Sequence, residues 1–527
     1  MLAKKNLLLA VIAIIVAIAL IVTAVVVYNP QEKENEDTLI VAISSDVKNW
    51  YLTQFADGDA RFVWAQIYGT LIRLDTDLNL IPGLASSWYT PDNGKTWIFN
   101  LTQGVRFHDG SEFNADAVLF SYGNDTYVRN YGVLARVNYL EKVDNYTVRF
   151  VMKSPTPLPY YLTHIAWPVM SPNMANPDGS WNGKIIGTGP FKFNYQITDQ
   201  EIVLDRYENY SGPAPLLKRI IFKVIKDPTT RVLALKAGDV DMIIKVSEQD
   251  VADLEATSGI HVQHRLTTFT DFLQFNTKTD PHNASVSPFT DLRVRKAVAY
   301  GIDTEKIVND LLDGIGMAAK GRPYSPVMLY SDPSLPLYEY NVTKAKSLLM
   351  EAGYTLGEDG YFYKNGSKLS TTILMTSEDP WAPRFTLMSQ AIASMLRDIG
   401  MDVTVESVPT AVFNSKEASG DFGMILRTGY FVWGPYPRHF AIHTSSGLWS
   451  HYQNASYDQL FRLADTTINV TLQEEYFRQL QRAVIDDLPA FYLVHEHKIV
   501  AYRDVVKGYV MTAEDPWLNL EGVSVER

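Results

Sequence analysis

Turn residues and a short strand alternate closely between Ile81 and Gly110, and this spacing constrains the local fold more than any other stretch of the chain. The segment begins with a short helix-like turn, passes through a hairpin turn at Pro91-Asp92-Asn93-Gly94, and enters a strand over Thr96–Leu101. A second turn closes at His108-Asp109-Gly110. The pattern predicts a β meander, which many folds contain, so spacing alone assigns no function.

The residues of this segment, as opposed to their spacing, resemble the oligopeptide/dipeptide class of solute-binding proteins that serve ABC importers. That class has a PgLAesW motif, a DGkt turn and a GvkFHDG ending, and the corresponding runs here start at Pro82, Asp92 and Gly104. The class then begins a helix with Ala-Asp-Asp-Val. Here the run Asn114-Ala115-Asp116-Ala117-Val118 has Ala117 at the position of the second acid.

Later motifs extend the resemblance over about residues 38–527 in unbroken order. Ile186–Phe191 resembles the GTGPF turn of the class, and Leu204–Gly212 resembles its rN..Yw.G turn. Because Pro190 follows the second glycine, and no strand and helix flank the turn, a nucleotide-binding loop is disfavoured. Asp271–Asp303 resembles a third segment of the class, in which a strand is followed by a helix. Asp291 would cap this helix, and Arg293 and Arg295 are interpreted as anchors of the helix to its lobe.

The resemblance implies an α/β fold of the bilobed periplasmic-binding-protein type II, with an extra subdomain inserted in the first lobe and one N-terminal transmembrane or signal helix in front. Two chain crossings, near Thr267–Phe272 and His495–Val500, would form the hinge. The expected division is 1–28 for the anchor or signal segment, 29–38 for a linker, 39–266 for lobe I with its insert at about 75–187, 267–496 for lobe II, and 497–527 for the return to lobe I.

Length and charge agree with an exported binding protein. A chain of 527 residues is too long for one ordinary core and predicts two or three domains or lobes. Its net charge of -12 and its lack of a long Lys/Arg run exclude a nucleic-acid partner, because phosphate binding needs a clustered basic surface.

The N-terminus carries a membrane signal. Lys4 and Lys5 precede an apolar run over Leu7–Val27, and acids follow it from Glu32 onward. About 21 residues suffice to span a bilayer of about 30 Å. The run exceeds the apolar core of about 7–15 residues that signal peptides usually have. An uncleaved anchor with the body outside the cell is therefore favoured over a cleaved signal, for which Val22-Thr23-Ala24 offers a site.

The chain has no cysteine and nine glycosylation sequons. Without cysteine it has no disulfide, no thiolate metal site and no lipid-attachment cysteine. Nine sequons in an exported chain suggest a glycoprotein, and together with a lipid-free tether they suggest an archaeal cell surface. The sequon asparagines are Asn100, Asn124, Asn145, Asn209, Asn283, Asn341, Asn365, Asn454 and Asn469.

Neither enzymatic chemistry nor a resident metal or cofactor is predicted. The chain has no Gly-x-Ser-x-Gly elbow, no catalytic cysteine and no HExxH motif. Two histidine groups are weak metal candidates, and some members of the class serve nickel importers. The first is His439, His443 and His451, and the second is His495 with His497, which would share one face of a strand.

An aromatic, Gly/Pro-rich loop over Gly429–Phe440 is the best candidate for the ligand cleft. In peptide-binding members the resemblance implies G-W-x-x-D-x-x-D-P-D-x-F there, where the first Asp pairs with the ammonium of the peptide. Here Tyr430 stands at the Trp, Trp433 at that Asp and Tyr436 at the second Asp. The carboxylate is thus replaced by an aromatic ring, which stacks well on sugar rings. Further candidate ligand residues are Trp50, Trp381, Phe272 and Asp46.

Two functions remain open. The first is a monomeric binding protein that captures oligopeptides or oligosaccharides, or a nickel or other metal chelate, and delivers them to a permease with a cytoplasmic ATPase. The second is a surface sensor with the same fold and no importer. Family habit favours peptides, whereas Trp433 favours sugars.

Overall fold

The computed structural model describes residues 37–51, 59–123, 132–165, 167–278, 287–378, 382–428, 436–437, 442–446, 452–513 and 518–527. The apolar run expected to be a membrane or signal helix, Leu7–Val27, lies outside these residues, as does most of the linker. Within the described ranges, no helix combines the length and the apolar character needed to cross a bilayer.

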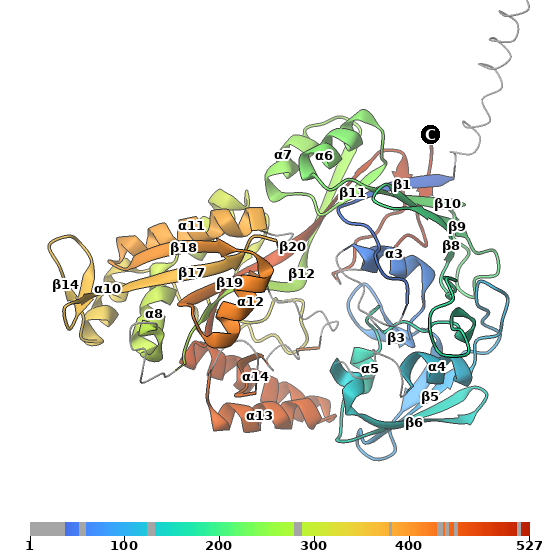
Figure 1. Ribbon diagram of the computed structural model, residues 1–527, viewed down its shortest axis with the longest axis horizontal. Coiled ribbons are helices and arrows are strands. Elements are labelled where there is room, and N and C mark those ends of the chain that lie inside the picture. The colour runs from blue at the N-terminus through green and yellow to red at the C-terminus, as the bar shows by residue number, and fades with distance from the viewer. Residues whose placement is uncertain are drawn as a thin grey trace, which may run out of the picture.

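One mixed sheet runs through both lobes of the protein (Figure 1). In the described part of the chain its order is β18-β17-β19-β12-β20-β11-β1-β10-β9-β8, with β13 beside β20. The apolar strand β1 lies between two parallel neighbours, β10 and β11. This position is the one expected for a strand that is buried on both faces. The strands are β1 (Thr38–Ile43), β8 (Phe191–Ile197), β9 (Glu201–Arg206), β10 (Arg219–Val224), β11 (Met242–Ile244), β12 (Ile260–Phe275), β13 (Met317–Ala318), β17 (Ser370–Thr376), β18 (Asp402–Val408), β19 (Met424–Thr428) and β20 (Ala490–Arg503).

The first lobe carries a second, antiparallel sheet in the order β4-β5-β7-β6, which lies at the lower right of Figure 1. Strand β5 has the bounds that the sequence predicts, Thr96–Leu101. Elements of this lobe include α3 (Ala60–Ile67), β2 (Ile72–Leu74), β3 (Leu80–Pro82), β4 (Ala85–Tyr89), β5, α4 (Ala115–Tyr122), β6 (Val137–Asp144), β7 (Thr147–Met152), α5 (Leu158–Tyr161), α6 (Pro228–Ala237), α7 (Val251–Glu255), β21 (Val506–Lys507) and β22 (Ser524–Val525).

The second lobe surrounds β17, β18 and β19 with helices. Asp291 caps α8 as predicted, since its carboxylate accepts a hydrogen bond from Arg293 N at 2.9 Å. Arg295 anchors this helix by donating to the carbonyl of Asp487 at 2.7 Å. The elements are α8 (Leu292–Gly301), α9 (Thr304–Lys306), α10 (Val342–Glu351), β14 (Thr355–Leu356), β15 (Phe362–Lys364), β16 (Ser367–Lys368), α11 (Ala382–Asp398), α12 (Thr410–Ser419), α13 (Ala455–Thr466) and α14 (Val470–Asp487).

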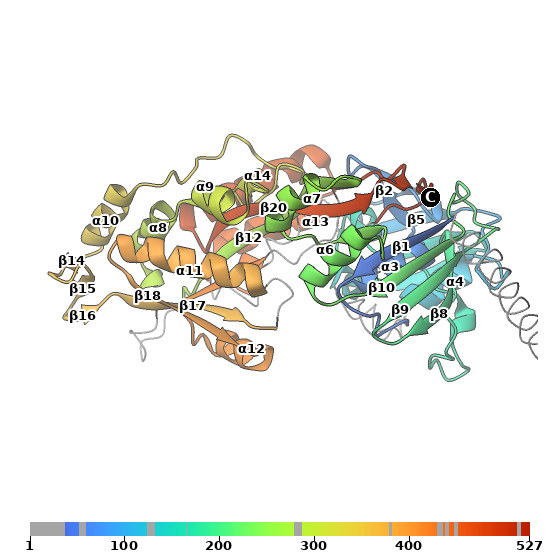
Figure 2. The ribbon, with the colours of Figure 1, turned by 90° about the horizontal axis from the view of Figure 1, so that it is seen from above.

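Strands β12 and β20 are the two long crossings between the lobes (Figures 1 and 2). The sequence predicts only a strand over 272–277, whereas β12 starts twelve residues earlier, at Ile260. Its first half is rich in His, Gln and Arg, so this half has no hydrophobic pattern from which a strand could be predicted. Pairing with β20 satisfies that backbone instead.

The helix-like turn predicted at the start of the Ile81–Gly110 segment is wrong. Leu80–Pro82 and Ala85–Tyr89 are strands β3 and β4, which pair with β2 and β5. A short apolar run does not distinguish helix from strand, and the partner strand decides here.

The hydrophobic core of the first lobe continues into helices α13 and α14 of the second. Phe461, Phe477 and Val484 belong to the same buried cluster as Trp64 and Tyr161. The two lobes therefore touch at this end as well as through the crossing strands.

Candidate functional site

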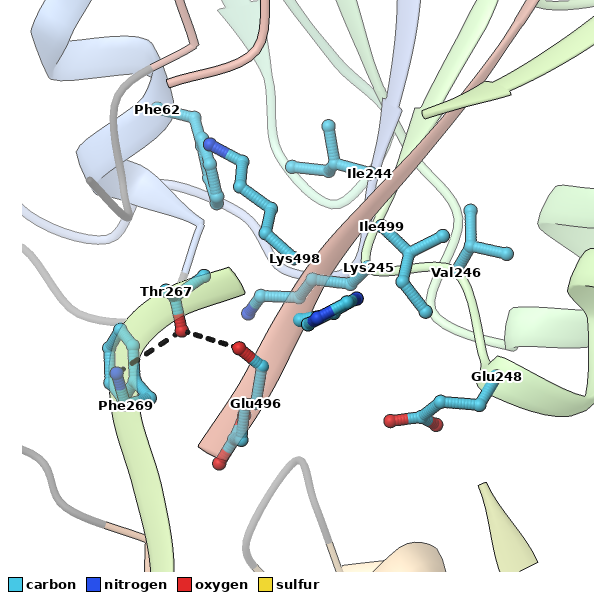
Figure 3. Close-up of a pocket in the computed structure, with 11 residues that line it drawn as sticks. Phe62, Ile244, Lys245, Val246, Glu248, Thr267, Phe269, Glu496, Lys498 and Ile499 are labelled. Carbon is cyan, nitrogen blue, oxygen red and sulfur yellow. Dashed lines mark hydrogen bonds between the residues drawn. The ribbon is translucent and has the colours of Figure 1, made fainter. Parts of the chain in front are cut away.

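A bulge interrupts the pairing of the two crossing strands. The β12–β20 register shifts between Leu266 and Thr270, so extra residues on β12 lie opposite Glu496. Thr267 Oγ1 donates to the carbonyl of Glu496 at 3.0 Å and accepts from Phe269 N at 3.1 Å (Figure 3). Bulges weaken the ladder and increase the local twist, which suits a hinge.

One arginine meets three carboxylates beside this bulge. Arg384, at the start of α11, contacts Asp271 on β12, Glu496 on β20 at 3.5 Å and Glu248 at 3.3 Å. Glu248 precedes α7 of the first lobe, whereas Arg384 belongs to the second lobe. The cluster therefore ties the lobes together across the hinge.

This cluster is buried and contains three acidic side chains but only one basic side chain. Asp271 is fully buried, and its Oδ1 has no hydrogen-bond partner among the described residues. Burial, together with Glu496 and Glu248, raises the pKa of Asp271 well above its ordinary value, despite the opposing charge of Arg384. Burial also raises the pKa of Glu248. Both shifts indicate that one guanidinium does not compensate the three carboxylates.

A cavity of about 40 Å³ lies next to this cluster between α3, β11, β12 and β20 (Figure 3). Both signs of charge line it. Lys245 pairs with the buried Asp59 at 2.6 Å, and Lys498 Nζ lies 5.5 Å from the ring centroid of Phe62. Burial opposes ionisation of Asp59, but Lys245 and the hydrogen bonds from Ser44 outweigh it and lower the pKa. The lining residues are Phe62, Ile244, Lys245, Val246, Glu248, Thr267, Phe269, Glu496, His497, Lys498 and Ile499.

A second contact joins the lobes through α5 and α13. Tyr436 of the second lobe stacks on Tyr160 of the first, with ring centroids 5.4 Å apart, and meets Phe477 edge-on at 5.5 Å. Arg136, just before β6, forms an ion pair with Asp465 of α13. Both sets of contacts hold the two lobes together.

The structure places Trp50 and Asp46 in the packing of the first lobe. Asp46 accepts hydrogen bonds from Gln196 Nε2 and from Asp199 N, both at 2.7 Å. The indole of Trp50 donates to Gln196 Oε1 at 2.9 Å and packs edge-on against Phe193. These contacts hold the loop after β1 against the β8–β9 hairpin.

Two further candidates lie inside the protein. Phe272 is buried against Tyr492, with ring centroids 5.2 Å apart. Tyr436 is fully buried in the contact between the lobes, and its hydroxyl accepts from Gln473 at 3.1 Å. Trp433, Tyr430 and Trp381 lie outside the described residues.

The described histidines of the two groups each bond to a different partner. His443 bonds Tyr492 at 2.9 Å, His495 bonds Thr270 at 2.9 Å, and His497 bonds His264 at 2.9 Å. His439 and His451 lie outside the described residues. Across the ranges that are described, no three His, Cys, Asp or Glu side chains converge as a metal site.

No local sequence pattern predicts the charge cluster around Arg384. Its members are far apart in the chain, at positions 248, 271, 384 and 496, and each is an ordinary charged residue in its local context. The one usable signal was an acid within each predicted hinge crossing, Asp271 and Glu496.

Comparison with known proteins gives a consistent assignment. The family model for bacterial extracellular solute-binding proteins, family 5 (middle region), matches residues 79–451. The nickel-binding periplasmic protein of Escherichia coli K12 is 30% identical over 400 residues, which cover 72% of each chain. The oligopeptide-binding protein AppA of Bacillus subtilis 168 is 27% identical over 482 residues, covering 86% of this chain and 85% of AppA.

A solved structure agrees on the fold. The crystal structure of NikA from Brucella suis in complex with Fe(III)-EDTA superimposes with a TM-score of 0.84 at 22% identity, covering 93% of this chain and all of that one.

Proposed function

The chain belongs to family 5 of the bacterial extracellular solute-binding proteins, and we propose that it captures a peptide between its two lobes and presents it to an ABC permease with a cytoplasmic ATPase. Members of the family act outside the cell or in the periplasm and bind solutes. No chemistry on the ligand is part of the proposal.

The observation that carries the proposal is the pair of crossing strands with a bulge at their centre. Two lobes joined in this way can close on a ligand by a small change of backbone angles at Thr267–Phe269 and Glu496. The register shift supports a boundary between the lobes at residues 266/267, with 39–266 and 497–527 in lobe I, 267–496 in lobe II and the insert at about 75–187.

Charge at the hinge favours a peptide over a neutral ligand. A peptide brings one ammonium and one carboxylate, and the hinge cavity is lined by Glu248 and Glu496 as well as by Lys245 and Lys498. The uncompensated negative charge around Arg384 favours the ammonium end here, since a buried cation needs a carboxylate partner. These acids therefore supply the negative charge that the class has as an Asp at the position of Trp433.

Peptides with and without a free N-terminus test this. Calorimetric titration of a tri- to nonapeptide panel should give binding that N-acetylation weakens at least 10-fold, and Glu496→Gln should weaken the free peptides while leaving acetylated ones unchanged. Glu141→Gln, a change in an exposed ion pair of the insert, is the control. Equal binding of free and acetylated peptides would refute the assignment of the ammonium.

Oligosaccharides and metal chelates are the competing ligands. The aromatic candidates Tyr430, Trp433 and Trp381 favour a sugar, and the similarity to a nickel-binding protein favours a chelate. A thermal-shift screen with oligosaccharides, nickel and nickel–histidine tests both, because a ligand at 100 times its Kd stabilises the fold by about 2.7 kcal/mol. Trp433→Ala should weaken any hit in the cleft, and an unchanged affinity would remove Trp433 from the site.

The N-terminal anchor, the glycans and the monomeric state also belong to the proposal. Three of the sequon asparagines, Asn341, Asn454 and Asn469, cap helices with their side chains, so their positions have a structural reason besides glycosylation. Mass spectrometry of the native protein should find residues 1–28 retained and glycans on exposed sequons such as Asn365. A mature N-terminus near Val25 or bare asparagines would overturn these two parts, and light scattering tests the monomer.

Transport and sensing are distinguished by the neighbouring genes. Permease and ATPase genes beside this one support transport. An isolated gene beside signalling components would support the surface sensor.

A further inference from the structure

A second cavity, of about 230 Å³, lies within the first lobe and shares no lining residue with the hinge cavity. It opens between the end of α3, the β2–β3 pair and the turn before β8. One water needs only about 10–15 Å³ of such space, whereas pockets for drug-sized ligands have about 300–1,000 Å³. The cavity therefore has room for a small molecule.

Three separate motifs of the sequence and one residue near the C-terminus meet around this cavity. Its wall contains Pro82-Gly83-Leu84 of the opening segment, Thr188-Gly189-Pro190 of the GTGPF-like turn, Tyr210-Ser211-Gly212 of the next turn, and Glu521 near the C-terminus. Binding in the cleft uses none of these residues. The first three segments belong to motifs by which the chain resembles its class, and the proposed binding between the lobes gives these motifs no role.

The wall is built with close backbone contacts. A Cβ on Gly189 would lie 2.5 Å from the carbonyl oxygen of Gln66, so only glycine allows the turn to pack against α3. His108 fixes the same turn, since its Nε2 lies 3.0 Å from the carbonyl oxygen of Gly189. His108 Nδ1 also accepts a hydrogen bond from Gly187 N at 3.3 Å, so both neighbours of Thr188 are held in place.

The polar groups in the cavity are incompletely satisfied. Arg73 lies 3.2 Å from Glu521 Oε1, and the hydroxyl of Tyr210 donates to the same oxygen at 2.9 Å. Thr188 is 3% exposed, and its buried Oγ1 has no hydrogen-bond partner in the described part of the chain. An unpaired hydroxyl in a buried wall is costly unless something in the cavity bonds to it.

We propose that this cavity binds a small zwitterion of the size of a free α-amino acid. The ligand carboxylate pairs with Arg73, its ammonium pairs with Glu521, and one of the two groups bonds Thr188 Oγ1. The protein groups carry one charge of each sign, so the bound molecule should be neutral overall with both charges present. The volume excludes the longer peptides that the cleft is proposed to take.

The test uses the full chain and the free amino acids as probes. Calorimetric titration should find at least one amino acid that binds, while its N-acetyl form and its methyl ester, each lacking one charge, bind at least 10-fold more weakly. Thr188→Val, which keeps the side-chain shape, should weaken binding several-fold, and Arg73→Gln and Glu521→Gln should weaken it at least 10-fold. Glu141→Gln should have no effect.

Changes in the cleft separate this site from the proposed function. Trp433→Ala and Glu496→Gln should change peptide affinity and leave amino-acid affinity unchanged, so each proposal can fail alone. The inference is overturned if no amino acid binds at millimolar concentration, which would mean that water alone fills the cavity. It is also overturned if binding is lost in Glu496→Gln but kept in Thr188→Val. If Arg73→Gln does not fold, Thr188→Val and the charge-deleted ligands still decide.

Discussion

Replacing Arg384 by methionine should destabilise the protein strongly and in a pH-dependent way. The side chain is nearly buried and is the shared partner of Asp271, Glu248 and Glu496. Removing one partner of a buried ion pair costs about 3–5 kcal/mol, because the remaining charges stay buried without compensation. Arg149→Met, in an ion pair with both side chains about 40% exposed, should cost less than about 1 kcal/mol.

The pH dependence follows from the carboxylates. The folded-state pKa of Asp271 already lies above its unfolded value. Protonation of Asp271 therefore stabilises the fold at low pH, and this stabilisation is lost as pH rises through the folded pKa. Without Arg384 that pKa rises further. The difference between wild type and variant should consequently be smaller at acidic pH and grow as pH rises.

Urea unfolding at pH 5, 6, 7 and 8 measures this difference. Adding Asp271→Asn to Arg384→Met should recover part of the loss at pH 8, because one uncompensated charge is gone. A loss below 1 kcal/mol at pH 8, or a loss equal at all four values, would refute the description of the cluster as a buried excess of negative charge.

Three further outcomes are expected. Asp465→Asn removes the ion pair with Arg136 and should weaken the association of the two lobes by about 1.5–3 kcal/mol. Small-angle scattering should then show a larger radius of gyration. The control Asp253→Asn, in an exposed ion pair, should leave the radius of gyration unchanged. Tyr436→Ala should lower the free energy of unfolding by about 3–5 kcal/mol, because the packing on Tyr160 and Phe477 is lost. Tyr436→Phe should lower it by only about 1 kcal/mol, because only the hydrogen bond with Gln473 is lost. Thermal unfolding of both variants measures the difference. Burial lowers the pKa of His108 to about 4 and of His164 and His495 to about 3. The free energy of unfolding should therefore fall as pH drops from about 6.5 to 4, by about 3 kcal/mol for His108 alone. His108→Gln should make this fall shallower by that amount, and a fall as steep as that of the wild type would contradict the reasoning.

Local sequence was reliable where a pattern carried its own stop signals. Thr96–Leu101 lies between two turns and has the predicted bounds, and Asp291 caps α8 as expected. It failed where a partner strand decides. The run before Tyr89 became β3 and β4, and the first half of β12 became a strand only through β20.

The family and the order of the elements could be predicted from the amino-acid sequence, because turn residues, caps and apolar runs act over a few neighbouring positions. Which side chains meet depends on the folding of distant segments onto one another. Asp46 and Trp50, expected in the cleft, hold a loop on the first lobe, since Gln196 lies beside both. Arg384 meets three acids that lie more than 100 residues away from it in the chain. Charge clusters of this kind depend on long-range packing, which leaves no periodic trace in the chain.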